Sequence, residues 1–155
     1  MREKRKDPTP PFGFLLDRDV SKAASLFPPK RTRTISQVGV PDNATDREIV
    51  EKAWELGRTI VTANGDHFVR EIEEYLNQTM QKTCHDMFGL VILPNGYEHQ
   101  RQSLKGVEER LRLDGKKITW SDVAKLDCCV RVKKTGNPEV TRFERCFYCR
   151  RLGRQ

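Results

Sequence analysis

The chain has 155 residues, of which 36% are hydrophobic and 33% are charged, with a net charge of +7. This length predicts one domain with a buried core, and the composition excludes an intrinsically disordered chain. No run of 18 apolar residues occurs, which argues against a membrane-spanning helix and a membrane partner. The basic N-terminus has no apolar segment behind it, so we expect no secretory signal and a cytoplasmic protein.

The charge is unevenly placed. Residues 1–6 have a net charge of +3 and residues 131–155 have +6, which leaves −2 of the total for the stretch between them. Basic ends around a slightly acidic body are typical of a protein that processes nucleic acid. A solubilising charge distribution is the alternative interpretation.

Hydrophobic periodicity predicts strands that alternate with helices. The predicted strands are 12–16, 33–38, 59–63 and 89–94, and the predicted helices are 20–27, 46–56, 67–77 and 98–113. Such alternation predicts a parallel sheet with helices on both faces. Farther along, the residues "TGNP" (135–138) lie between two apolar segments, which predicts a β-hairpin appended to this body.

Acidic residues occur where the carboxyl ends of parallel strands would form a ligand site. Asp17 closes the first strand, Asp46 begins the helix before the third strand, and Asp66 follows the third strand. Converging carboxylates repel one another, and Mg²⁺ or Mn²⁺ relieves that repulsion and can activate water against a phosphodiester. The alternative is a purely structural role, with Asp17 and Asp66 as helix caps and a capping box at 45–48.

The segments "FLLDRDV", "ATDREIVEKAWELGRTIVTANGDHF" and "GLVILP" together resemble a small PIN-like nuclease domain, of the compact branch similar to VapC-type toxins, over residues 12–94. The resemblance implies a three-layer α/β/α fold with a mostly parallel sheet of about four strands. It also implies an endoribonuclease that depends on Mg²⁺ or Mn²⁺. Its catalytic and metal-binding acids would be Asp17, Asp46 and Asp66, supported by Asp19, Glu48, Thr62 and Asn64.

The stretch "VTANGDHF" (61–68) departs from that family pattern. Asn64 stands where the family usually has an acid, and His67 separates Asp66 from Phe68. An amide can form hydrogen bonds but brings no charge to hold a cation. A catalytically weak or inactive RNA-binding module is therefore the alternative function. For some family members the resemblance implies a small antitoxin-like partner, and a homodimer is left open.

The predicted hairpin contains cysteines and basic residues. The odd number of cysteines, five, favours reduced thiols or metal ligands over disulfides. Folding about "TGNP" would place residue 128 opposite residue 145. The candidate ligands of a structural zinc are Cys128, Cys129, Cys146 and Cys149. The alternative for Cys128 is an ordinary core position.

Basic side chains interleaved with aromatic ones suit single-stranded RNA, and we expect them, with Cys129, on the other face of the hairpin. The candidate RNA-binding residues are Arg131, Lys133, Arg142 and Arg145. A solvated strand face is the alternative interpretation. The predicted organisation is a basic tail at 1–11, a PIN-like domain at 12–113 and a basic, cysteine-containing extension at 114–155.

Overall fold

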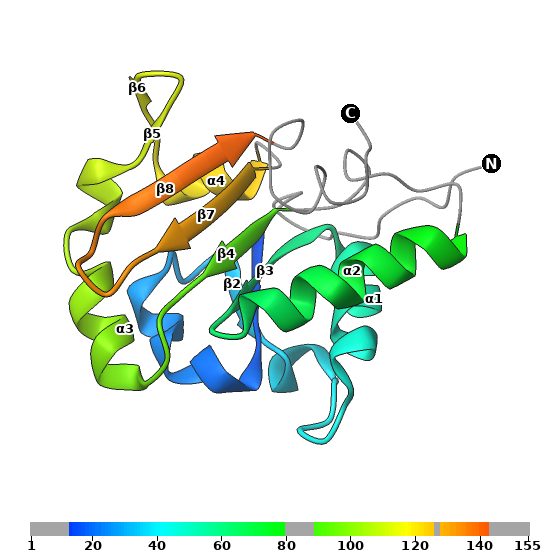
Figure 1. The fold of residues 1–155 in the computed structure, drawn as a ribbon. Helices are drawn as coiled ribbons and strands as arrows, with labels where there is room; N and C mark the ends of the chain where they lie inside the picture. The colour runs from blue at the N-terminus through cyan, green and yellow to red at the C-terminus, as the bar shows by residue number, and fades with distance from the viewer. Residues whose placement is uncertain (1–12, 80–88, 126–127, 143–155) are drawn as a thin grey trace.

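A computed structural model of the chain describes residues 13–79, 89–125 and 128–142 (Figure 1). The molecule is an α/β fold built on a sheet of six strands in the order β2-β1-β3-β4-β7-β8. These strands are β1 (Gly13–Leu16), β2 (Thr32–Thr34), β3 (Arg58–Thr62), β4 (Leu90–Ile92), β7 (Cys128–Val132) and β8 (Pro138–Arg142). The first five are parallel, and β8 is antiparallel to β7.

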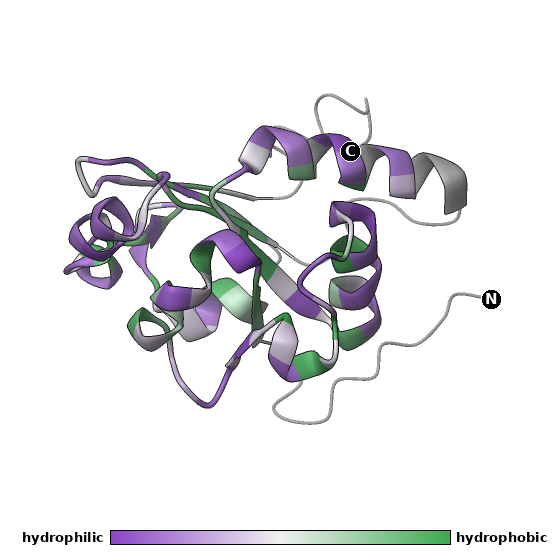
Figure 2. Ribbon diagram, turned by 90° about the horizontal axis from the view of Figure 1, so that it is seen from below, coloured by the Kyte–Doolittle hydropathy of each residue, from purple (hydrophilic) through white to green (hydrophobic). Residues whose placement is uncertain are grey.

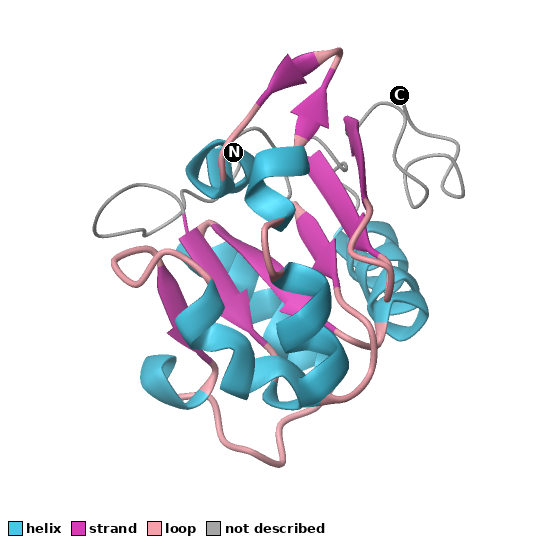
Figure 3. Ribbon diagram, turned by 90° about the vertical axis from the view of Figure 1, so that its left-hand side faces the viewer, coloured by secondary structure: helices cyan, strands magenta, loops and turns pink. Residues whose placement is uncertain are grey.

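Helices cover both faces of the sheet (Figure 3). The α-helices are α1 (Asp46–Leu56), α2 (Gly65–Thr79), α3 (Tyr97–Leu104) and α4 (Trp120–Lys125). The 3₁₀ helices are η1 (Arg18–Leu26), η2 (Ser36–Val38) and η3 (Val107–Arg110). A separate two-stranded hairpin is formed by β5 (Arg112–Leu113) and β6 (Lys116–Lys117). In the described part of the chain, no helix combines the length and the apolar character needed to cross a bilayer.

The sheet has a hydrophobic core on each face, because the side chains of its strands alternate between the two faces. In β3, Ile60 packs with the helices α1 and α2, whereas its neighbour Val61 packs on the opposite face with η1, α3 and α4. Successive strand residues point to opposite faces, so a sheet covered on both sides needs apolar residues at every position. Hydrophobic residues accordingly gather along the strands, with hydrophilic ones toward the outside of the helices (Figure 2).

The predicted α/β class and the mostly parallel sheet are confirmed, but the predicted sheet of about four strands is too small. The "TGNP" hairpin does form, as β7 and β8, yet it is not an appendage. Cys129 pairs with Leu90, so β7 joins the main sheet in parallel beside β4. This pairing joins segments far apart in sequence, which local periodicity does not report. The PIN-like fold itself stays a prediction.

Local details also differ from the predictions. The predicted helix at 98–113 is interrupted, because α3 ends at Leu104 and Gly106 adopts a left-handed φ of +71° before η3. The segment at 20–27 lies largely in a 3₁₀ helix, and the predicted strand at 33–38 contains only two strand residues, Arg33 and Thr34, before η2 begins. The β5–β6 hairpin and α4 were not predicted, since their short segments have little periodicity.

Candidate functional site

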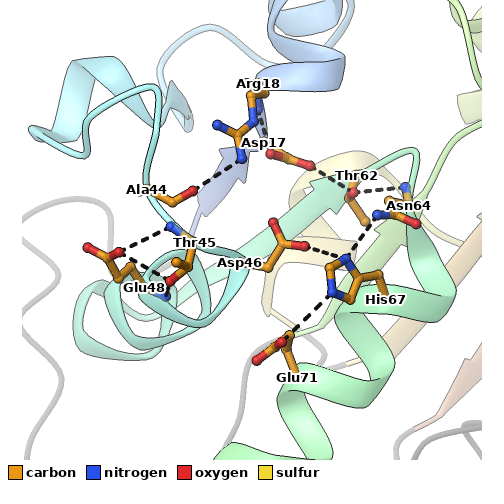
Figure 4. Close-up of polar contacts among 10 residues, drawn as sticks. All are labelled: Asp17, Arg18, Ala44, Thr45, Asp46, Glu48, Thr62, Asn64, His67 and Glu71. Carbon is orange, nitrogen blue, oxygen red and sulfur yellow. Dashed lines mark hydrogen bonds and ion pairs between the residues drawn. The ribbon is translucent and has the colours of Figure 1, made fainter.

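The candidate site lies at the carboxyl edge of the sheet, beyond the adjacent strands β1 and β3. The amide of Asp17 donates to the carbonyl of Val61 at 3.0 Å, so the chain leaves β1 directly beside the end of β3. This brings Thr62 against Asp17, and Thr62 Oγ1 donates to Asp17 Oδ2 at 3.1 Å. The backbone N–H of Asn64 then donates to Thr62 Oγ1 at 3.0 Å (Figure 4). A short chain of hydrogen bonds therefore orders the β3–α2 turn against the carboxylate.

Asp17 is almost fully buried, with 2% of its surface exposed. Its Oδ1 accepts from the amide of Arg18 at 2.7 Å, so it is also the N-cap of η1, as the structural alternative predicted. Burial raises the pKa of Asp17 above its ordinary value, and the nearby charges of Asp19 and Asp46 raise it further, against the lowering effect of the hydrogen bonds from Thr62 and Arg18. The Asp17 carboxyl is therefore harder to ionise than a carboxyl in water.

Asp46 is the first residue of α1. The preceding Thr45 caps the helix: its Oγ1 accepts from the amide of Glu48 at 3.2 Å, and Glu48 Oε1 accepts from the amide of Thr45 at 3.1 Å. The predicted capping box is therefore confirmed, and it engages Glu48, one of the candidate supporting acids. Asp46 itself takes no part in the box and turns toward α2 (Figure 4).

Arg18 fixes the loop before α1 to the end of β1. Its guanidinium donates to the backbone carbonyls of Asp42 and Ala44, the latter at 3.1 Å. The residue immediately after Asp17 thus holds the backbone immediately before Thr45 and Asp46 (Figure 4). Because both clamped carbonyls lie within four residues of Asp46, Arg18 is a positioning residue for that carboxylate.

His67 completes the group from the first turns of α2. Its Nδ1 lies 2.7 Å from Asp46 Oδ2 and 3.2 Å from Asn64 Nδ2, while its Nε2 lies 3.8 Å from Glu71 Oε1 (Figure 4). An imidazole nitrogen either donates or accepts, so Asp46 and Asn64 compete for Nδ1. A protonated Nδ1 donates to Asp46, and a bare Nδ1 accepts from Asn64. The ring thus links the ends of α1 and α2 at the site.

The structure brings together only part of the predicted set. Asp17, Asp46, Thr62 and Asn64 form one connected edge with His67, whereas Asp19 and Asp66 are exposed in the first turns of their helices. Within the described ranges, no three His, Cys, Asp or Glu side chains form a group that could hold a metal ion. Two carboxylates, rather than three, therefore define the acidic part of this edge.

Sequence reasoning missed His67 and Arg18 as site residues. The spacing of His67 and Glu71, four residues apart on a helix, was a signal that the histidine faces along α2 rather than into the core. No comparable signal existed for Arg18, because its partners are backbone carbonyls 24 and 26 residues away. Only the fold brings these groups together.

The hairpin cysteines occupy core positions. Cys128 is fully buried among the residues on the α3 and α4 face, as the core alternative predicted. Cys129 is 3% exposed, belongs to the core cluster on the α1 and α2 face and pairs with Leu90, so its predicted place on a solvent face is wrong. The α1 and α2 layer covers that face. The predicted zinc site also needs Cys146 and Cys149, which lie outside the described residues.

The predicted basic face of the hairpin is divided between two ends of the sheet. Cys128 pairs with Arg142, not with residue 145, so the backbone of Arg142 lies at the amino end of β7. Lys133 follows β7 and is exposed at the carboxyl edge, the edge that also contains Asp17. Arg131 is half-buried opposite Glu139, and Arg145 lies outside the described residues. Lys133 is therefore the predicted RNA-binding residue best placed relative to the carboxylates.

Comparison of the chain with protein-family models, with curated proteins and with solved structures finds no match. The resemblance to PIN-like domains therefore rests on the sequence segments quoted above. The function has to be inferred from the chemistry of the carboxyl edge itself.

Proposed function

We propose that the chain is a divalent-metal-dependent ribonuclease of PIN-like type, whose cation is held by Asp17 and Asp46. The observation that supports this proposal is geometric: the buried Asp17 and the Asp46 carboxylate held by His67 belong to one connected edge. Asp17 closes β1, Asp46 begins α1, and the charge of Asp46 adds to the burial that raises the pKa of Asp17. Folding thus holds two acids at the edge where open parallel sheets bind ligands, although burial and the charge of Asp46 make ionisation of Asp17 harder. A cation between them would remove that penalty.

The donor set is compatible with Mg²⁺ or Mn²⁺. Mg²⁺ commonly keeps several waters and takes one or two carboxylates, with substrate phosphates supplying further oxygens. Asp17 and Asp46 would supply the carboxylates, and the amide oxygen of Asn64 is a further neutral donor. Asp19 and Asp66, exposed near the same edge, are candidates to hold metal-bound water. When bound, the cation would activate water and stabilise the leaving oxygen of an RNA phosphodiester.

A second candidate function is RNA binding without cleavage. It is favoured by one observation: the β3–α2 turn presents Asn64 to the site, and the next acid, Asp66, is exposed. Loss of one carboxylate weakens a cation site because fewer charges offset the cost of dehydrating the ion. A toxin-type role with an antitoxin-like partner stays a prediction of the sequence resemblance.

The test is cleavage of a labelled single-stranded RNA with Mn²⁺, Mg²⁺ or EDTA. Wild type would be compared with Asp17→Asn and Asp46→Asn, and with Glu74→Gln as a matched loss of one exposed carboxylate on α2. We expect cleavage by wild type and Glu74→Gln only when metal is present, and none by the two aspartate variants. Equal cleavage by all four proteins would sink the nuclease proposal. RNA binding by all four proteins with no cleavage would establish the second candidate function.

A further inference from the structure

Four exposed basic side chains surround the turn that joins β7 to β8. We call them the basic turn cluster: Lys105, Arg110, Lys133 and Lys134. Arg110 reaches the turn directly, because its Nε and Nη2 donate to the carbonyl of Gly136 at 3.1 and 2.7 Å. Lys105 follows α3 two residues after Ser103, whose carbonyl oxygen lies 3.3 Å from the position that a Cβ of Gly136 would occupy.

The turn has a fixed shape. The amide of Gly136 donates to the carbonyl of Lys133 at 2.7 Å, and the amide of Lys133 donates to the carbonyl of Asn137 at 3.3 Å. Gly136 is buried at a φ of +86°, a left-handed conformation that glycine adopts without strain. The backbone that presents Lys133 and Lys134 is therefore ordered before any ligand arrives, which lowers the entropic cost of binding.

The acids nearest in sequence to the cluster have neighbours outside it. Glu109 forms an ion pair with Lys117 of β6 at 3.0 Å. Glu108 accepts from the backbone amide of Trp120, at the start of α4, at 2.9 Å. Glu139 lies opposite Arg131 of β7 in the strand register. These described contacts direct the three glutamates toward groups outside the cluster.

The cluster lies on the same edge of the sheet as the carboxylates. Because β7 is parallel to β1, β3 and β4, the turn after Val132 leaves the sheet at the carboxyl edge. Three strand spacings separate β1 from β7 in the order β1-β3-β4-β7, which is about 14 Å. One extended polyanion can therefore contact the lysines at one end of this edge and reach Asp17 and Asp46 at the other.

We infer that the basic turn cluster binds backbone phosphates of the RNA strand whose cleaved bond lies at Asp17 and Asp46. The inference rests on the proposed function for the identity of the strand, and it adds where that strand crosses the protein. Lysine and arginine contacts to phosphates position a strand without reading its sequence. The expected ligand is therefore RNA of any sequence, and affinity should depend strongly on salt.

The test measures binding of a single-stranded RNA of about 12 nucleotides in EDTA, by fluorescence anisotropy at several salt concentrations. The variant is Lys133→Gln/Lys134→Gln, and the charge-preserving control is Lys133→Arg/Lys134→Arg. The matched control is Lys30→Gln/Lys116→Gln, which removes two exposed lysines away from the carboxyl edge. Lys30 precedes β2, and Lys116 lies in β6. The β5–β6 hairpin that contains Lys116 projects from the opposite side of the molecule (Figure 3).

We expect Lys133→Gln/Lys134→Gln to bind RNA about tenfold or more weakly at low salt, with a salt slope smaller by about 1.4, since each single-strand phosphate contact contributes about 0.7. Both control pairs should keep the wild-type slope. An unchanged slope in the glutamine variant, an equal loss in the matched control, or no RNA binding by wild type would overturn the inference. Cluster-dependent binding without cleavage would instead sink only the proposed nuclease function. Cleavage with cluster-independent binding would sink only this inference.

Discussion

The imidazole Nδ1 of His67 lies 2.7 Å from Oδ2 of Asp46, and this contact joins the first turn of α2 to the first residue of α1. Asp46 has 13% of its side chain exposed and His67 has 45%, so the pair is only partly screened by water. The second contact of the ring, 3.8 Å from Nε2 to Glu71, is longer and looser. The ring is therefore coupled mainly to Asp46.

A double-mutant cycle measures this coupling. Replacing His67 and Asp46 singly and together by alanine should give a coupling free energy of about 1 kcal/mol, the net value of one hydrogen bond to a charged group that is partly exposed. The parallel cycle of His67 with Glu71 should give about 0.3 kcal/mol, as for an exposed ion pair on a helix. Urea unfolding near neutral pH provides the values. Equal coupling in both cycles would contradict the geometry.

Asp17 should make stability depend on pH. Burial raises the pKa of its carboxyl in the folded state above the unfolded value of 3.8. Below that value the acid is protonated in both states, and as the pH rises through the folded-state pKa the unfolded state ionises more readily, so stability is lost. Asp17→Asn keeps one oxygen for the amide of Arg18, and its Nδ2 can donate to Thr62 Oγ1. Its stability advantage over wild type should therefore grow as the pH rises from acidic to neutral.

Urea unfolding of both proteins between about pH 3 and pH 8 checks this prediction. The control is Thr62→Val, which removes the hydrogen bond that lowers the pKa of Asp17. This variant should lose stability more steeply than wild type as pH rises. A finding that Asp17→Asn is less stable than wild type at neutral pH, in metal-free buffer, would refute the role of burial.

Arg18 should stabilise the approach to α1. Arg18→Gln removes a guanidinium that donates to the carbonyls of Asp42 and Ala44, and we expect it to lower the free energy of unfolding by about 1 to 2 kcal/mol. The control Arg33→Gln loses only local contacts to the carbonyls of Pro29 and Thr32, so it should change stability by about 0.5 kcal/mol or less. Thermal unfolding of the two variants measures both losses of stability. Equal losses would mean that the contacts of Arg18 stabilise the fold no more than the local contacts of Arg33 do.

Local signals were sufficient for the element that carries Asp46. Helix α1 begins at the capping box and ends before Gly57, which has a left-handed φ of +69°, and both limits were predicted from the sequence. Strands β1 and β3 were likewise predicted to within two residues, because an apolar run in each is followed directly by a polar residue. The neighbouring positions of Asp17 and Thr62 follow directly once these strands are adjacent.

Long-range contacts determine the features that the sequence analysis missed. The extension of the sheet depends on the pairing of β4 with β7, and the clamp of Arg18 depends on a loop more than twenty residues away. His67 was seen only as an insertion in a family pattern, because its partner Asp46 lies on another helix. Periodicity reports which side of an element is buried, and it does not report which elements meet.

Metal binding should depend on Asp17 and Asp46 much more than on Asp66. A ligand that binds only the folded state raises its stability, by about 2.7 kcal/mol when present at a hundred times its dissociation constant. We expect Mn²⁺ to raise the melting temperature of wild type, and EDTA to reverse the rise. Asp17→Asn and Asp46→Asn should lose the response, whereas Asp66→Asn should keep most of it, because Asp66 is exposed on α2 outside the connected edge.

The combination of two measurements makes this prediction specific for Asp17. Without metal, Asp17→Asn should be more stable than wild type. With metal, this difference in stability should shrink or reverse, since only wild type is stabilised by binding the ion. A substitution that simply disrupts the fold would lower stability both with and without metal, which distinguishes it from the loss of a metal ligand. Loss of the Mn²⁺ response in Asp66→Asn, as complete as in Asp46→Asn, would instead place Asp66 among the ligands. The third predicted carboxylate would then join the site only when the cation is bound.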